Sequence, residues 1–428
     1  MAPMQNKINY KQPQKFTLDN GIRIIAERVP ETFSCAVSIW IDAGSIDEEV
    51  SNSGVSHFLE HIVFKGTKTR SAKDIAEESE NVGANLNAFT DREHTCYHTR
   101  VLSEYVPIVI ELFLDMIFNP KLQDNDLELE RQVILEEIKM YLDTPEDLVQ
   151  DLLYEVIWKG HPLGRPITGT TQSISSLKKE HIKEYLTDLY TPDNIVISVA
   201  GNFNVDDVIK QTEKLSSHIK KKRNKKDFPP LLITPDVFIE DKEIELSHLS
   251  FATKGVSVYE EDRYTLASID AALGAGMSSR LYQEIRENRG LAYAISSYYN
   301  TNKLGGLFGV YAGTSGKESG TVIDLILKEL KEVKKSGLKP EELERAKMQL
   351  KSSLLLELES TKVRSFRNAL YDLYYNRFIA PDEINQSVQS ISNEKIIKLA
   401  DELFDPKYFT LTVVGPREEL PKKFKLTI

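Results

Sequence analysis

Apolar residues follow two different periods along the chain, and these periods predict where strands and helices lie. Alternating apolar and polar positions predict two short strands on either side of the Asp19-Asn20-Gly21 turn, and further strands at 34–43, 83–90, 94–101 and 194–200. Apolar positions three or four apart predict helices at 71–81, 106–118, 124–141 and 145–158. The first half of the chain is therefore expected to combine a sheet with several helices.

The pattern recurs in the second half at a constant displacement. Residues 128–131 recur as 342–345, and the strand segment 192–201 recurs in character as 406–415, so both pairs are 214 positions apart (128 to 342, 192 to 406). A shared displacement at two distant places indicates a duplicated unit. We therefore predict an α+β chain of two homologous α/β domains, at 1–219 and 231–428, joined by a basic linker at 220–230.

A short predicted helix near residue 57 carries the first candidate chemistry. Ser53 is expected to cap it, and His57 and His61 lie four residues apart, so both imidazoles share one helical face with Glu60 beside them. Catalytic zinc takes three protein ligands and keeps a position open for water. The order His-x-x-Glu-His is a known zinc-protease motif, although a helix with two hydrogen-bonded histidines is the plain alternative.

A third ligand is expected on the helix at 124–141. Glu130 and Glu137 are seven residues apart and share a face, whereas Glu136 points elsewhere. The 214-residue displacement places Ala271 and Ala275 opposite the two histidines and Lys351 opposite Glu137, so the second half lacks all three candidate ligands together. This joint absence favours Glu137 as the ligand and Glu130 as a carboxylate that orients a histidine or water. The alternative is that both glutamates only form a solvated acidic helix face, and this alternative is stronger for Glu130 than for Glu137.

Composition narrows the function further. The chain has 428 residues, which suits two domains, and a formal net charge of -11, which argues against a nucleic-acid surface. Cys35 and Cys96 show no pairing pattern, so a reducing compartment is expected. The first residues lack leader character, and no run reaches the length of a membrane span. We therefore expect a cytoplasmic protein without nucleic-acid or membrane partners.

Four ordered motifs together resemble the pitrilysin or insulinase (M16) family of zinc proteases, with the processing-peptidase branch most similar. They are His57-Phe-Leu-Glu-His61, Asn87-Ala-Phe-Thr90, the Glu130 to Glu137 segment and Arg286-Glu-Asn-Arg-Gly-Leu-Ala-Tyr293. The resemblance implies one zinc ion per chain, held by His57, His61 and Glu137, with Glu60 as general base and Glu130 as support. It also implies two domains that close like a clam-shell around a peptide-binding chamber.

The resemblance assigns roles to the remaining motifs as well. Arg286 and Tyr293 would bind the scissile carbonyl and stabilise its developing negative charge. The segment formed by Asn87, Ala88, Phe89 and Thr90 would be an edge strand to which an extended peptide adds as a further strand.

These observations lead to a functional hypothesis with two alternatives. We predict a zinc metalloendopeptidase, acting as a homodimer, that cleaves short or unfolded peptides with a preference for basic ones, because the chain is acidic. One alternative is a processing-peptidase subunit that needs a separate partner chain. The other is a non-catalytic structural or assembly subunit on the same fold.

Overall fold

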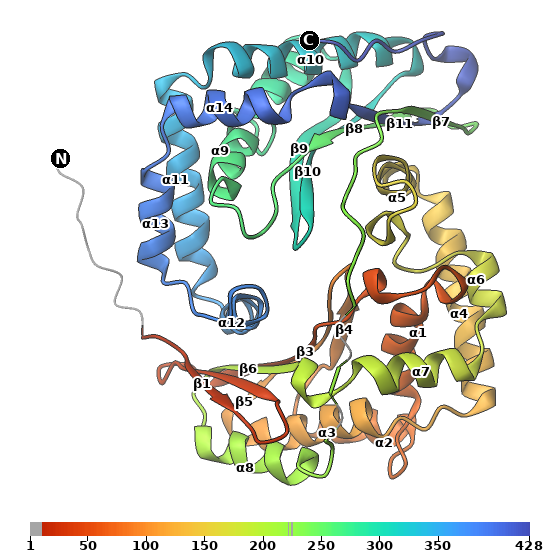
Figure 1. Cartoon of the computed structure of the whole chain (residues 1–428), viewed down its shortest axis with the longest axis vertical. Helices are drawn as coiled ribbons and strands as arrows, with labels where there is room; N and C mark the ends of the chain where they lie inside the picture. The colour runs from red at the N-terminus through yellow and green to blue at the C-terminus, as the bar shows by residue number, and fades with distance from the viewer. Residues whose placement is uncertain (1–10, 221, 224–225) are drawn as a thin grey trace. The chain divides into compact units, whose positions relative to one another are not determined.

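The structure is a computed structural model that describes residues 11–220, 222–223 and 226–428. It divides into two compact units, shown in Figure 1. Unit 1 comprises residues up to 139, 165–228 and 356–380, and unit 2 comprises 140–164, 229–355 and 381–428. Each unit combines one sheet with several helices, which confirms the predicted α+β class and the two-domain organisation.

Unit 1 is built on a six-stranded sheet with the order β1-β2-β6-β3-β5-β4. Strands β2 and β6 are parallel, and the other neighbours are antiparallel. The β1–β2 hairpin turns at the predicted Asp19-Asn20-Gly21 segment. The strands are β1 (Gln14–Thr17), β2 (Arg23–Arg28), β3 (Ser34–Ile41), β4 (Asn87–Thr90), β5 (Thr95–Leu102) and β6 (Ile195–Gly201).

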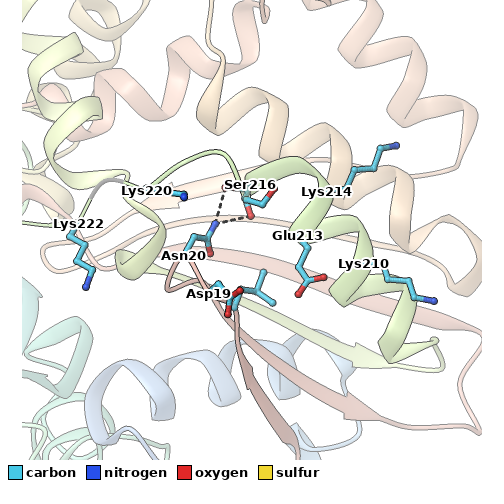
Figure 2. Close-up of a pocket in the computed structure, with 10 residues that line it drawn as sticks. Asp19, Asn20, Lys210, Glu213, Lys214, Ser216, Lys220 and Lys222 are labelled. Carbon is cyan, nitrogen blue, oxygen red and sulfur yellow. Dashed lines mark hydrogen bonds between the residues drawn. The ribbon is translucent and has the colours of Figure 1, made fainter.

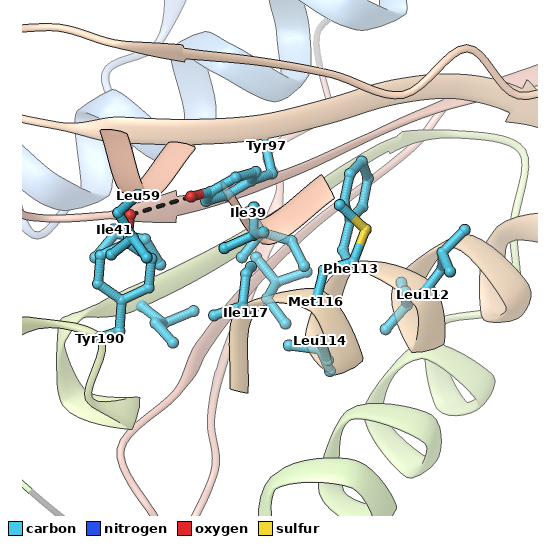
Figure 3. Close-up of a cluster of buried hydrophobic side chains, with 14 of the residues drawn as sticks. Ile39, Ile41, Leu59, Tyr97, Leu112, Phe113, Leu114, Met116, Ile117 and Tyr190 are labelled. Carbon is cyan, nitrogen blue, oxygen red and sulfur yellow. Dashed lines mark hydrogen bonds between the residues drawn. The ribbon is translucent and has the colours of Figure 1, made fainter. Parts of the chain in front are cut away.

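Both faces of this sheet are buried, as β3 illustrates. Ile39 and Ile41 join the main core with helix α3, whereas Trp40 belongs to a second cluster with residues of helix α12. Figure 3 shows the main core, where side chains of β3 and α3 meet Leu59 of helix α1. The unit 1 helices are α1 (Val55–Ile62), α2 (Ala72–Asn81), α3 (Val106–Phe118), most of α4 (Asp124–Asp143), α6 (Thr171–Ser176), α7 (Lys179–Leu189), α8 (Val205–Ser216) and α12 (Thr361–Tyr375).

Unit 2 repeats the same sheet without the first strand. Its order is β7-β11-β8-β10-β9, with β7 and β11 parallel and the other neighbours antiparallel, which matches β2-β6-β3-β5-β4 strand for strand. The strands are β7 (Val237–Asp241), β8 (Ser247–Lys254), β9 (Ala292–Asn302), β10 (Gly305–Thr314) and β11 (Thr410–Gly415). The helices are α5 (Pro145–Ile157), α9 (Arg263–Leu273), α10 (Ser319–Ser336), most of α11 (Pro340–Glu357), α13 (Pro381–Gln389) and α14 (Asn393–Leu403). The structure thus shows the duplication that the sequence displacement predicts.

The compact units differ from the contiguous halves predicted at 1–219 and 231–428, because the two halves exchange one helix. Helix α12, from the second half of the chain, packs against β2, β3 and β6 of unit 1. Helix α5, from the first half, packs against β8 and β11 of unit 2. Part of the predicted linker at 220–230, namely 221 and 224–225, lies outside the described residues, as do residues 1–10.

Buried polar contacts hold α12 on the unit 1 sheet. The Glu27 carboxylate, 2% exposed, accepts hydrogen bonds from the Arg364 guanidinium and from the Asn368 amide, the latter at 2.6 Å. The Ser365 hydroxyl lies 2.7 Å from the Ser38 hydroxyl and 2.9 Å from the Ser198 carbonyl oxygen. These pairings are specific to this helix and sheet, so α12 is an integral layer of unit 1.

In the described part of the chain, every helix is too short or too polar to cross a bilayer.

Candidate metal centre

Helix α1 starts differently from the prediction. Ser53 does not cap it; Gly54 is the N-cap residue with a positive φ of 90°, and a Cβ atom there would lie 2.7 Å from the Thr168 carbonyl oxygen. The capping acceptor is the Glu48 side chain, which is 1% exposed. It accepts from the Gly54 N–H (2.8 Å), the Ser56 N–H (2.9 Å) and the Ser56 hydroxyl (2.6 Å). A carboxylate brought by the fold replaces the predicted serine cap because it satisfies more of the free N–H groups.

His57, His61 and Glu137 come together in unit 1. One ligand atom from each lies within 4.8 Å of the others. Among the described residues, no other group of three or more His, Cys, Asp or Glu side chains lies this close together. The Nε2 atoms of His57 and His61 are each 3.8 Å from a Glu137 carboxylate oxygen. Two imidazoles and one carboxylate are a donor set that suits catalytic zinc, so these residues fit the ion that the sequence predicts.

Burial prepares His57 to act as a neutral ligand. Its pKa is lowered to about 4, first by desolvation and then by the neighbouring His61. The imidazole is therefore uncharged at neutral pH, and no proton has to leave before a metal binds. Its Nδ1 is buried without a hydrogen-bond partner in the part of the chain that the structure describes.

His61 contacts Glu130, which in turn forms an ion pair with Lys65. Its Nδ1 lies 3.0 Å from Glu130 Oε1, and Glu130 Oε2 lies 2.6 Å from Lys65 Nζ. Burial acts to lower the pKa of His61, but the bond with Glu130 and the carboxylates of Glu137 and Glu60 outweigh it, so the pKa is raised. The structure thus places Glu130 where the sequence hypothesis needs it. Sequence reasoning did not single out Lys65, although it repeats the four-residue spacing of His57 and His61.

Glu60 lies beside the edge strand β4. The Thr90 hydroxyl donates a hydrogen bond of 2.6 Å to Glu60 Oε2. Burial raises the pKa of Glu60, while the Thr90 bond and His61 act in the opposite direction. A carboxyl with a raised pKa is better suited to exchange protons near neutral pH.

The other residues of β4 have separate environments. The Asn87 side-chain oxygen accepts from the Ala88 N–H at 2.8 Å. Ala88 packs on the main core, whereas the Phe89 ring lies 5.5 Å from Trp40 and 5.8 Å from Phe366, measured between ring centroids. Strand β4 is the last strand of the sheet order, with β5 on one side.

Arg286 and Tyr293 belong to unit 2, whereas the histidines and Glu137 belong to unit 1. Arg286 lies in a π-helical turn at Tyr282–Glu287, and Tyr293 lies on β9 with 77% of its surface exposed. The Arg286 guanidinium is 5.9 Å from the Tyr293 ring centroid, so the two predicted residues are neighbours within their unit. Gly290, with a φ of 62°, lies between the helical turn and the strand that carry these two residues.

Unit 1 also has a cavity of about 800 Å³ whose lining includes none of the candidate metal ligands. Figure 2 shows its polar lining, where the Asn20 amide donates to the Ser216 carbonyl and hydroxyl oxygens at 2.8 and 3.0 Å. Four lysines and two carboxylates belong to its lining: Lys210, Lys214, Lys220, Lys222, Asp19 and Glu213. This mixed charge points to no particular ligand, so the group of His57, His61 and Glu137 remains the candidate site of unit 1.

Known proteins of similar sequence match nearly the whole chain. It is 38% identical over 408 residues to the uncharacterized zinc protease YmxG of Bacillus subtilis, covering 95% of this chain and 99% of that protein. It is 36% identical over 405 residues to an uncharacterized zinc protease of Rickettsia felis, covering 94% and 97% respectively. A crystal structure of a protease from Helicobacter pylori has the same fold, with a TM-score of 0.88 at 23% identity, covering 95% of this chain and 100% of that one.

Two family models match in succession, in agreement with the duplicated fold. Residues 23–171 match insulinase (peptidase family M16), and residues 176–350 match the peptidase M16 inactive domain. The first match contains His57, His61 and Glu137, and the second contains Ala271 and Ala275, which the 214-residue displacement places opposite the two histidines. The chain therefore belongs to the insulinase family, peptidase family M16.

Proposed function

We propose that this chain is a zinc metalloendopeptidase that cleaves short or unfolded peptides. The observation that carries the proposal is the convergence of His57, His61 and Glu137, with Glu60 on the same helix as the two histidines. Its family and the zinc proteases among its relatives support the same activity. Three protein ligands leave room for water, which favours a catalytic site over a structural one.

In the proposed mechanism His57, His61 and Glu137 would hold one zinc ion per chain, through two imidazoles and one carboxylate. When bound, zinc lowers the pKa of a water molecule and polarises the carbonyl that is attacked. Glu130 contacts Nδ1 of His61 and so fixes the orientation of this imidazole, with Nε2 on the side of Glu137. Glu60 accepts the proton of the attacking water on its carboxylate and then donates that proton to the departing amine.

We propose that the substrate is an extended peptide that pairs with the free edge of β4, formed by Asn87, Ala88, Phe89 and Thr90. Backbone pairing of this kind requires an unfolded segment of the substrate and depends little on its sequence. Arg286 and Tyr293 are proposed to donate hydrogen bonds to the developing oxyanion, on the basis of the family resemblance. We further propose that the chain forms a homodimer, that it is cytoplasmic and that it prefers basic peptides.

The Glu60→Gln variant tests the proposed chemistry. A glutamine keeps the shape of the side chain but cannot accept a proton, so the variant is expected to bind zinc like the wild type and to lose cleavage of a quenched basic peptide. The matched control is Glu136→Gln, since Glu136 is an exposed glutamate paired with Lys139 at 2.6 Å. Full activity of Glu60→Gln would contradict the proposed base. Absence of zinc from the wild type would favour the non-catalytic subunit, and zinc without cleavage would favour a missing partner chain.

A further inference from the structure

The hydroxyl of Thr90 is already committed to Glu60. Its Oγ1 donates to Glu60 Oε2 across 2.6 Å, which is short for an O–H···O bond and typical of a charged acceptor. A threonine hydroxyl has one proton to donate. The Thr90 hydroxyl therefore cannot also donate to a peptide along β4, whereas the predicted pairing of a peptide with this strand uses backbone groups and is unaffected.

The local structure explains why Thr90 points to the base. Successive side chains of a strand alternate between its two faces, and Ala88 and Thr90 share one face of β4. Ala88 packs on the core that includes Phe58 and Leu59 of α1, whereas Phe89 on the other face packs against Trp40 and Phe366. The Thr90 hydroxyl thus faces α1, and its bond to Glu60 links the helix of the two histidines to the edge strand.

The bond also distinguishes the two oxygens of the Glu60 carboxylate. Oε2 accepts from Thr90, and none of the described residues donates a hydrogen bond to Oε1. Without the hydroxyl, the carboxylate could turn about its last side-chain torsion, which is broad for glutamate. A base has to lie within hydrogen-bond reach of the proton that it removes, so this freedom would lower the fraction of productive orientations.

We propose that Thr90 is a positioning residue for catalysis: it holds Oε2 of Glu60 so that Oε1 is presented as the proton acceptor. The inference rests on the proposed role of Glu60 as general base. It assigns to the last residue of β4 a role in orienting the base, in addition to the pairing of β4 with a peptide.

The Thr90→Val variant tests the inference because valine keeps the β-branched shape and removes only the hydroxyl. The expected result is a loss of about tenfold in kcat, part of the contribution of a general base, with KM, zinc content and thermal midpoint unchanged. Thr90→Ser is expected to restore most of kcat, since serine supplies a hydroxyl at the same position. The matched control is Thr99→Val, whose hydroxyl on the neighbouring strand donates to the Asn85 carbonyl at 2.9 Å and not to Glu60.

The outcomes separate this inference from the proposed function. Wild-type cleavage that Glu60→Gln abolishes, together with an unchanged kcat in Thr90→Val, would overturn the inference alone; so would a failure of Thr90→Ser to restore kcat. If the wild type cleaves no peptide, crystal structures of the wild type and Thr90→Val still test whether Thr90 orients the Glu60 carboxylate. The inference requires one Glu60 orientation in the wild type and a turned or multiple orientation in Thr90→Val, and an unmoved carboxylate would overturn it.

Discussion

The bond between Glu130 and His61 leads to a quantitative prediction about metal affinity. Glu130 Oε1 lies 3.0 Å from His61 Nδ1, and the Glu130 side chain is 5% exposed, so water cannot easily replace the carboxylate. In the Glu130→Gln variant an amide oxygen can still accept from Nδ1, but the negative charge near the ligands is lost. The second Glu130 partner, Lys65, is 41% exposed and can be solvated after the change.

The size of the effect follows from the kind of bond. Hydrogen bonds to charged groups contribute about 1.5–3 kcal/mol, and residues that orient metal ligands contribute about 10–100-fold in metal affinity. Because the glutamine keeps one acceptor, we expect the zinc affinity of Glu130→Gln to fall by about tenfold, equivalent to about 1.4 kcal/mol. Glu130→Ala, which keeps no acceptor, is expected to lie near the upper end of the range.

Competition with a chromophoric zinc chelator at pH 8 measures this affinity directly. Glu136→Gln is the matched control, because Glu136 lies on the same helix and its side chain is 70% exposed. The reasoning would be refuted if Glu130→Gln bound zinc as tightly as Glu136→Gln.

Two further predictions concern the elements that support the site. Burial raises the pKa of Glu48 from 4.5 to about 7, so its contribution to stability is complete below about pH 4.5 and is lost as the pH rises through 7. The unfolding free energy of the metal-free wild type, relative to Glu48→Gln, should therefore fall by about 3 kcal/mol between pH 4 and pH 8 in urea titrations, and equal pH slopes would contradict this. Arg364→Met should lower the unfolding free energy by about 3–5 kcal/mol, because Glu27 is left buried without its cation. The double variant with Glu27→Gln should recover part of that loss, and simple additivity would show that the pair is not coupled.

Features that depend on local spacing could be predicted from the sequence. The helical face shared by His57 and His61 needs only the period of a helix, and the choice of Glu137 needed only the comparison of the two halves at a constant displacement. The α+β class and the duplicated sheet followed from the same periodicity and the same displacement.

Features that depend on contacts between distant segments could not be predicted. Glu48 caps α1 from a preceding loop, and the Thr90 hydroxyl meets Glu60 from a strand thirty residues further on. Neither contact produces a repeating pattern of residues in the sequence from which it could be predicted. The exchange of α5 and α12 could not be predicted either. The two halves of the chain have similar apolar patterns, so the sequence does not indicate on which sheet each helix packs. Buried pairings such as those of Glu27 with Arg364 and Asn368 distinguish the two choices.

If His57, His61 and Glu137 hold one zinc ion for catalysis, the metal content of the protein must depend on them. Elemental analysis of the purified wild type and of Glu137→Gln, combined with cleavage of the same quenched basic peptide, is the measurement required. We expect near-stoichiometric zinc and chelator-sensitive cleavage in the wild type, with both lost in the variant. Equal zinc content in the two proteins, or a wild type that takes up no zinc when the metal is supplied, would contradict this expectation.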